Sequence, residues 1–246
     1  QTGLEQLGIP KDTPWVCLIV RDSKYLYETL PWRDWSYHDY RNCTIDNYIM
    51  AAKKLSDLGY YVVRMGVHVR KKMKVSDPKI IDYACNGLRT DFMDIYLGAN
   101  CNFCISNGTG YDAVPYIFRR PIMYIDHVPL EAIATYNCNS LSTSKRIKLI
   151  KENRFMKFEE IFSSGLNKWD AINDRINESN DIELVESSPE EINEAVIEME
   201  SRLKGVCSSS PEDEELQKKF WEIYPKSNDH GEIRSRMGTD YLKQNM

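Results

Sequence analysis

The first half of the chain alternates short apolar runs with segments of helical periodicity. The apolar runs are typical of buried strands and occupy residues 15–22, 60–69, 80–85, 101–106 and 120–126. Residues 44–59 and 89–100 predict amphipathic helices between them. Strands that alternate with helices favour right-handed crossovers and a mainly parallel sheet, with ligands bound at the carboxyl ends of the strands.

The clearest of these helices is predicted over residues 44–59. Thr44 is the expected cap and Gly59 the expected terminator. Between them the apolar positions follow helical spacing: Ile45, Ile49, Ala52 and Leu55. This pattern predicts a crossover helix with one face on the sheet.

From Ser140 onward the pattern becomes mostly helical. Residues 182–188 predict a last strand, and residues 230–245 a final helix. The two strongest helix starts are Ser-Pro pairs followed by acidic residues, at Ser188 and Ser210. We therefore predict a Rossmann-like three-layer α/β domain over residues 1–140 and a mostly helical extension packed on it over residues 141–246.

Composition supports a globular protein and argues against a broad surface for nucleic acid or anionic membranes. The chain has 246 residues with 42% hydrophobic content, enough for one large or two small cores. Lys and Arg number 32 against 37 Asp and Glu, and a net charge of -5 argues against broad binding to nucleic acid or anionic membrane. We see no signal-peptide pattern and no apolar run of roughly 20 residues, so the expectation is a cytoplasmic protein without a membrane span.

Cysteine and histidine patterns give no sign of a metal or disulfide framework. The seven cysteines are irregularly spaced, which favours reduced core thiols. Cys101 and Cys104 stand three apart in a predicted strand, so their side chains should point to opposite faces and not meet. His38, His68 and His127 lack metal-ligand spacing, and we expect no metal site and no bound cofactor.

A glycine-rich turn follows the fourth predicted strand, with the sequence Ser106-Asn107-Gly108-Thr109-Gly110. Gly108 and Gly110 allow a positive φ and close approach of a ligand, while Ser106, Asn107 and Thr109 offer side-chain groups for phosphate oxygens. The turn matches neither the dinucleotide nor the Walker pattern. Two interpretations stay open, an anion site and an ordinary turn.

Basic residues are expected at the same edge of the sheet. Arg21 ends the first strand, Arg64 lies near the end of the second, and the basic run from Arg70 to Lys72 follows. An arginine at the end of an apolar strand needs an anion or a carboxylate partner. A diphosphate fits Arg21, Arg64 and the turn, whereas a salt bridge at Arg64 and a solvated loop for the lysines are the simpler alternatives.

Several segments together resemble a known family. Residues 20–22, 40–66, 82–110, 155–166, 189–203, 213–221 and 230–245 resemble, in that order, a bacterial family of glycosyltransferases from surface-polysaccharide gene clusters, known mainly by sequence. The resemblance implies a GT-B fold of two Rossmann-like domains, of which this chain is similar to the C-terminal, donor-binding one. It implies a nucleotide-sugar donor, a glycan or lipid-linked acceptor, and transfer without a metal ion.

The resemblance also suggests residues that contact the nucleotide or the sugar. These are Arg41, Asn42, Gly66, Asp82, Tyr83, Arg89 and Asp91. For several of these residues a structural role is the alternative to ligand binding. The alternatives are a helix-entry cap at Arg41 and Asn42, a pair between Arg89 and Asp82, and stabilisation of a helix dipole by Asp91.

The catalytic residue is not assigned. The resemblance places the acceptor domain and the usual catalytic base upstream of this chain, so an excised C-terminal portion is the expectation. A nucleotide-sugar epimerase of the same fold and a non-catalytic nucleotide- or glycan-binding module are the alternatives. The sequence names neither the nucleotide, the sugar, the acceptor nor the stereochemistry, and the oligomeric state is open as well.

Overall fold

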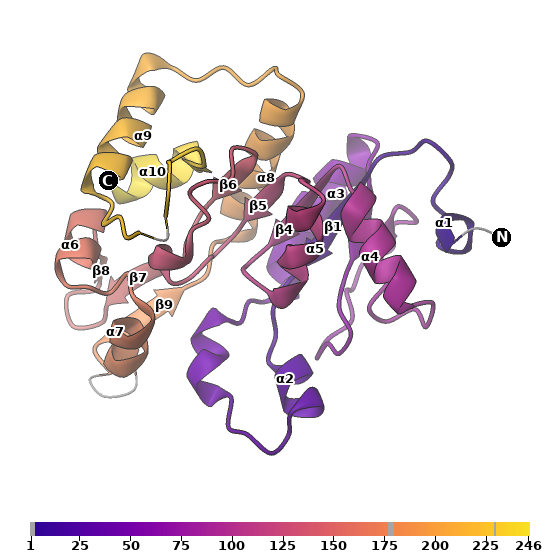
Figure 1. Ribbon diagram of the computed structural model, residues 1–246, viewed down its shortest axis with the longest axis horizontal. Coiled ribbons are helices and arrows are strands. Elements are labelled where there is room, and N and C mark those ends of the chain that lie inside the picture. The colour runs from indigo at the N-terminus through magenta and orange to yellow at the C-terminus, as the bar shows by residue number, and fades with distance from the viewer. Residues whose placement is uncertain (1–2, 177–179, 229) are drawn as a thin grey trace. The chain divides into compact units, whose positions relative to one another are not determined.

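The computed structural model describes residues 3–176, 180–228 and 230–246 (Figure 1). The chain forms two compact units, Gln1–Met123 and Tyr124–Met246. This division lies closer to the N-terminus than residue 140. The assignment of domains to residues 1–140 and 141–246 stays a prediction.

The first unit is built on a mainly parallel sheet. Its strands follow the order β5-β4-β1-β2-β3, and β1 pairs in parallel with both β2 and β4, as β2 does with β3. Their bounds are β1 (Trp15–Ile19), β2 (Tyr61–Arg64), β3 (Ile80–Ile81), β4 (Phe103–Ser106) and β5 (Ile122–Tyr124), which crosses into the second unit. β1 lies at the centre of the sheet and is almost entirely buried, which explains why its sequence is a nearly continuous apolar run.

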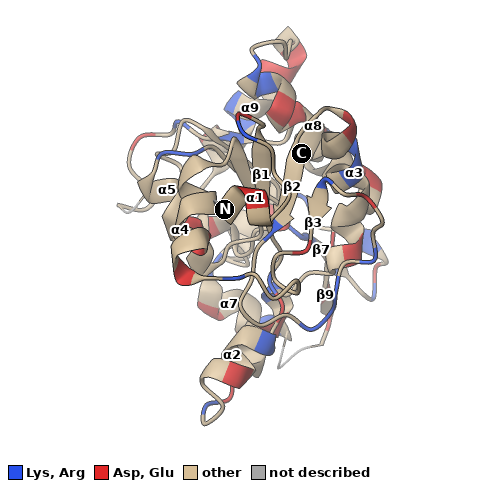
Figure 2. Ribbon diagram, turned by 90° about the vertical axis from the view of Figure 1, so that its right-hand side faces the viewer, with Lys and Arg blue, Asp and Glu red and all other residues tan. Residues whose placement is uncertain are grey.

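Helices flank this sheet on both sides. Figure 2 places α4 and α5 on one side of β1 and β2, and α3 on the other. The helices of the unit are α1 (Gly3–Gln6), α2 (Lys24–Thr29), α3 (Ile49–Asp57), α4 (Asp91–Asn100) and α5 (Ala113–Ile117), with 3₁₀ helices η1 (Ser36–Arg41), η2 (Ile45–Tyr48) and η3 (Gly110–Asp112). The first unit is therefore an α/β, Rossmann-like layered fold, as the sequence predicts.

The second unit combines short strands with the two longest of the described helices, α8 and α9. β6 (Ser140–Ser142) lies beside the end of β5, where the Thr143 amide donates to the Tyr124 carbonyl at 2.8 Å, and β10 (Arg236–Met237) pairs in parallel with the other edge of β6. An antiparallel sheet runs β8-β7-β9, that is β8 (Arg154–Phe155), β7 (Arg146–Leu149) and β9 (Ile182–Val185). The helices are η4 (Leu130–Ala132), α6 (Phe158–Ser163), α7 (Trp169–Asp174), α8 (Pro189–Leu203), α9 (Pro211–Ile223) and α10 (Thr239–Asn245).

The helix starts at Ser188 and Ser210 are confirmed. Each serine accepts a hydrogen bond from the amide three residues later, and the acidic side chain there closes a capping box. The predicted final helix is shorter than expected, because residues 236–237 form β10 before α10 begins at Thr239. The two residues of β10, Arg236 and Met237, form no apolar run that a sequence pattern could detect.

Two predictions for the first half need correction. The helix over residues 44–59 begins as the 3₁₀ helix η2 before α3 starts. Cys101 does not lie in β4 but caps the end of α4, so Cys101 and Cys104 are not on opposite faces of one strand. Both are buried, free thiols, and burial, followed by the nearby Cys101, raises the pKa of Cys104. These two cysteines are core thiols, as expected.

Basic and acidic residues are interspersed along the chain. Basic and acidic side chains share α2 and α9 (Figure 2). No helix among residues 3–176, 180–228 and 230–246 combines the length and the apolar character that crossing a membrane requires.

Candidate functional site

The carboxyl edge of the sheet in the first unit carries the predicted turn. Ile19 at the end of β1 stands in register with Ser106 at the end of β4, and Leu18 stands in register with Arg64 at the end of β2. The turn after Ser106 and both strand-end arginines therefore share one edge, which confirms their predicted placement.

The turn itself is built around a carboxylate of the chain. The Asp112 side chain accepts hydrogen bonds from the Ser106 hydroxyl at 2.5 Å, the Thr109 amide at 2.9 Å and the Thr109 hydroxyl at 3.1 Å. The Gly108 amide donates to the Ser106 hydroxyl at 3.1 Å. Two amides expected to face a ligand thus have acceptors within the protein.

Burial gives Asp112 an unusual pKa. Loss of hydration raises the pKa of this carboxyl to about 6, although the hydrogen bonds from Ser106 and Thr109 oppose the change. Sequence reasoning missed Asp112. The pattern that identifies it is an acidic residue three positions after Thr109, a capping box at the start of η3.

The glycines of the turn differ in role. Gly108 adopts a φ of +83°, whereas Gly110 does not lie in the left-handed region, because η3 already begins there. The expected need for glycine therefore holds at Gly108 alone. The helix that follows is short, since η3 and α5 together span only residues 110–117.

Hydrogen bonds join the turn to two arginines. The Arg41 guanidinium donates to the Gly108 carbonyl at 2.7 Å. The Arg21 amide donates to the Asn107 side-chain oxygen at 2.8 Å, and the Asn107 side-chain nitrogen donates to the Arg41 carbonyl at 3.4 Å. The Cys43 amide in turn donates to the Arg21 carbonyl at 2.9 Å. Residues from three distant segments are thus brought together.

We call Arg21 and Arg41 the Arg21–Arg41 pair. Burial and then the charge of Arg41 lower the pKa of Arg21 to about 10, and burial lowers the pKa of Arg41 as well. Among the residues that the structure describes, no carboxylate lies within ion-pair distance of Arg21. The Arg21 Nε is also buried without an acceptor. Two half-buried like charges favour the arrival of an anion.

Arg64 has a different environment. Its side chain is 1% exposed, and Nη1 donates to the Lys71 carbonyl at 2.6 Å and lies 3.3 Å from both Asp82 carboxylate oxygens. Asp82 also accepts from the Met73 amide at 2.9 Å. The Arg64–Asp82 pair therefore anchors the loop after β2, which is the structural alternative that the sequence left open.

The remaining predicted residues divide between cavity and scaffold. Gly66, at a φ of +148°, lines a cavity. Tyr83 is fully buried and its hydroxyl accepts from the Thr90 amide at 2.9 Å. Arg89 pairs with Asp94 at 2.7 Å and with Asp91 at 3.0 Å, so the alternative pair with Asp82 does not form. Asn42 donates to the Asp39 carboxylate at 2.8 Å.

The cavity beside Arg21 measures about 250 Å³. Sites that enclose drug-sized ligands span about 300–1,000 Å³, so this one is sized for part of a larger ligand. Burial raises the pKa of Asp94 in its wall, against the opposing charge of Arg89. The lining is mostly apolar with a few polar groups: Ile19, Val20, Arg21, Asp22, Tyr25, Met65, Gly66, Val67, His68, Val69, Asp94, Thr109 and Tyr111.

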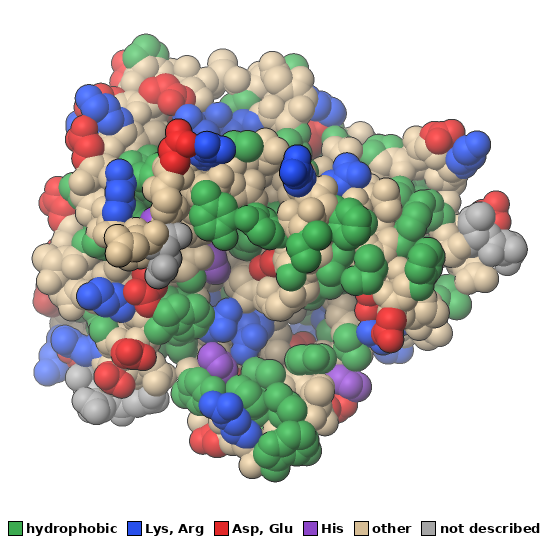
Figure 3. Space-filling view, in the orientation of Figure 1, with side chains coloured by type: hydrophobic (Ala, Val, Ile, Leu, Met, Phe, Trp, Pro, Cys, Tyr) green, Lys and Arg blue, Asp and Glu red, His purple; other side chains and the backbone are tan. Residues whose placement is uncertain are grey.

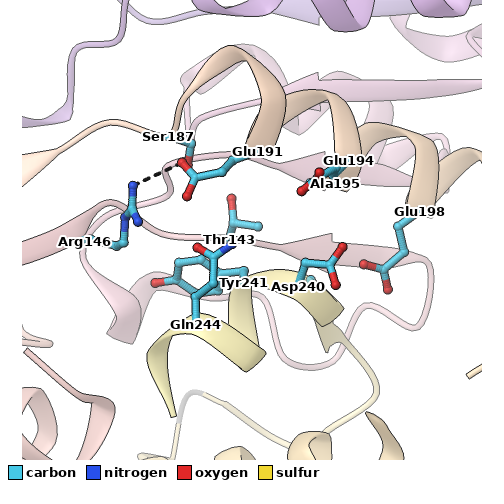
Figure 4. A pocket seen from close by; sticks show the side chains of 11 residues that line it. Thr143, Arg146, Ser187, Glu191, Glu194, Ala195, Glu198, Asp240, Tyr241 and Gln244 are labelled. Carbon is cyan, nitrogen blue, oxygen red and sulfur yellow. Dashed lines mark hydrogen bonds and ion pairs between the residues drawn. The ribbon is translucent and has the colours of Figure 1, made fainter. Parts of the chain in front are cut away.

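A second hollow lies in the second unit (Figure 4). Arg146 and Glu191 form an ion pair of 3.1 Å at one end, and Glu194, Glu198 and Asp240 add further acidic groups. Its volume of about 20 Å³ holds about one water molecule. It is too small and too acidic for a nucleotide.

Comparison with known proteins gives little. No family model and no curated protein matches the chain. One solved structure, titled "S. aureus MnaA-UDP co-structure", is similar at 13% identity with a TM-score of 0.36. The match covers 86% of this chain and 51% of that chain, so this chain spans about half its length. A likeness this distant carries no argument about function.

Proposed function

We propose that the first unit binds a nucleotide-diphosphate sugar, as the donor-binding part of a glycosyltransferase. The observation that carries the proposal is the Arg21–Arg41 pair at the carboxyl edge of the sheet. Each guanidinium presents a planar fork of donors, which suits the oxygens of a diphosphate.

The adjoining cavity supports the same proposal. Its apolar wall suits the faces of a base or a sugar ring, and its few polar groups can fix their orientation. We assign the diphosphate to the Arg21–Arg41 pair and one end of the ligand to the cavity. The turn contributes its Gly108 carbonyl as the anchor of Arg41, since two of its amides are engaged by Asp112 and Ser106.

The proposal includes binding without a metal ion. Positive charge from the two arginines can neutralise the leaving diphosphate, a role that divalent cations fill elsewhere. Chelation with EDTA should leave binding and transfer unchanged. We place the reaction in the cytoplasm, in line with seven free cysteines, and we assign the acceptor as a glycan or a lipid-linked glycan on the resemblance alone.

Calorimetric titration with UDP-, GDP-, CDP- and ADP-sugars tests the proposal. One nucleotide class should bind to the parent chain and bind far more weakly to Arg21→Met. Lys54→Gln, which removes an exposed charge on α3, is the control and should bind like the parent. Absence of binding by every nucleotide sugar would overturn the proposal.

Product analysis then separates the reaction classes. Transfer of the sugar to an acceptor by the full-length protein identifies a glycosyltransferase. Conversion of the bound sugar into its epimer identifies the nucleotide-sugar epimerase, and binding without either product identifies a non-catalytic module.

A further inference from the structure

An aromatic segment follows Arg21 and carries a histidine that the proposed function does not use. In the segment that spans α2 and η1, the His38 ring stacks on the Trp35 ring at a centroid distance of 6.0 Å and lies tilted by 35° against the Tyr37 ring at 4.1 Å. Figure 3 shows hydrophobic side chains gathered over this part of the molecule. Contacts with both rings hold the His38 imidazole in one orientation.

His38 lies on the same face of η1 as Arg41. The two residues are three positions apart in a 3₁₀ helix, where side chains three apart are eclipsed. Arg41 reaches the Gly108 carbonyl, so this face of η1 is directed to the turn. His38 therefore belongs to the surroundings of the Arg21–Arg41 pair.

The groups that act on His38 are mostly cationic. They are Arg21 after β1, Arg33 before η1, and Arg41 and the single acidic Asp39 within η1. Burial, followed by Arg21, Arg41 and Arg33, lowers the pKa of His38. The His38 Nδ1 is buried without a hydrogen-bond partner, so a proton on this atom has no acceptor in the free protein.

We propose that His38 is a third contact of the anion site, and that it takes up a proton from solvent when a phosphate-type anion occupies the Arg21–Arg41 pair. This inference rests on the proposed function. An anion between the arginines replaces a repulsive environment for imidazolium by an attractive one, and it supplies the missing acceptor. Binding of the anion and protonation of His38 then favour each other, so affinity increases as the pH falls through the pKa that His38 has in the complex.

Proton NMR of the histidine rings tests this with sulfate as the probe. Sulfate is a tetrahedral dianion that does not titrate near neutral pH, so any proton uptake belongs to the protein. The His38 resonance is assigned by its loss in His38→Gln. Sulfate should raise the pKa of His38 by about one unit or more relative to chloride at equal ionic strength.

Two comparisons make the result decisive. In Arg21→Met, the free His38 should already titrate at higher pH because a cation is gone, and sulfate should shift it little. His230, whose ring accepts from the Ser227 amide at 2.8 Å in the second unit, is the internal reference, and its resonance should respond little to sulfate in either protein. An unchanged His38, or an equal shift in Arg21→Met, would overturn the inference.

The outcome is distinguishable from failure of the proposed function. If a nucleotide sugar binds through Arg21 while sulfate leaves His38 unaffected, the function stands and the inference fails. If sulfate shifts His38 but no nucleotide sugar binds, the anion site stands and its assignment to a nucleotide sugar fails.

Discussion

Arg64 ends β2 and Arg21 follows the neighbouring parallel strand β1, so both lie at one edge of the sheet, yet their surroundings differ. Arg64 is 1% exposed and pairs with Asp82, while its guanidinium also reaches the Lys71 carbonyl. Arg21 is half-buried beside Arg41, and no described carboxylate lies within ion-pair distance of it. Nε lacks an acceptor in both arginines, so the two sites differ in whether a carboxylate pairs with the guanidinium: Asp82 does so at Arg64, and no described carboxylate does so at Arg21.

This difference separates a structural arginine from a candidate binding arginine. A buried guanidinium with its own carboxylate is already neutralised, and its removal leaves a buried charge behind. A guanidinium beside another cation gains free energy when an anion arrives. The Arg64–Asp82 pair should therefore govern stability, and the Arg21–Arg41 pair should govern ligand affinity.

The largest expected effect is on stability at the Arg64–Asp82 pair. Arg64→Met should lower the free energy of unfolding by about 3 kcal/mol, because Asp82 loses its partner and the Lys71 carbonyl loses its donor. Urea denaturation measures this change. Arg21→Met is the matched control and should cost less than about 1 kcal/mol, since it breaks no ion pair. Equal losses in the two variants would contradict the comparison.

The next effect concerns Asp112, whose carboxylate lies near Arg41 in the turn. Its pKa is about 6 in the folded state and about 3.9 when unfolded, so the folded state binds more protons between these values. Its contribution to stability is present below about pH 4 and is lost as the pH rises through about 6. The full change amounts to about 2–3 kcal/mol.

Asp112→Asn should reduce this pH dependence. The measurement is urea denaturation of parent and variant at several pH values between these limits. Asp126, which burial also gives a pKa of about 6, is present in both proteins and cancels in the difference. Identical pH profiles would show that Asp112 is ionised alike in the folded and unfolded chain.

The sequence predicts the placement of the site better than its chemistry. Apolar runs and the glycine-rich turn place Ser106, Arg21 and Arg64 at one edge, because parallel strands all end there. The hydrogen-bond and ion-pair partners of the arginines do not follow from the pattern of apolar and polar residues. Arg64 meets Asp82 through the loop after β2, and Arg41 meets Gly108 across distant segments, so both contacts depend on the tertiary fold.

Short elements are the other part that the sequence does not reveal. The two-residue β8 and β10 carry too few positions for periodicity to show, whereas β3 lies within the strand predicted over residues 80–85. The capping box at Asp112 has a recognisable spacing, but the same residues suit a phosphate-binding turn. Only the observed hydrogen bonds to Asp112 separate these interpretations.

The next smaller effect is expected on the binding free energy of the ligand, at Arg21. Arg21→Met should weaken binding of the nucleotide sugar by roughly tenfold to a hundredfold, the usual value of one charge-assisted contact. Calorimetry at constant ionic strength measures the affinity. Arg64→Met, provided that it remains folded, should bind within about threefold of the parent, because its guanidinium is already engaged by Asp82. The reverse ranking would assign the anion site to Arg64.

The smallest effect is expected at Thr109. Thr109→Ala removes the hydroxyl that donates to Asp112 at 3.1 Å, but the Thr109 amide and the Ser106 hydroxyl continue to hold that carboxylate. Loss of one of several hydrogen bonds should cost about 0.5–1 kcal/mol of stability and leave the affinity for a nucleotide sugar nearly unchanged. Denaturation and calorimetry on the same protein measure both quantities. A tenfold loss of affinity at unchanged stability would mean that the hydroxyl turns from Asp112 to the ligand, and that the turn binds phosphate directly rather than through the Arg21–Arg41 pair.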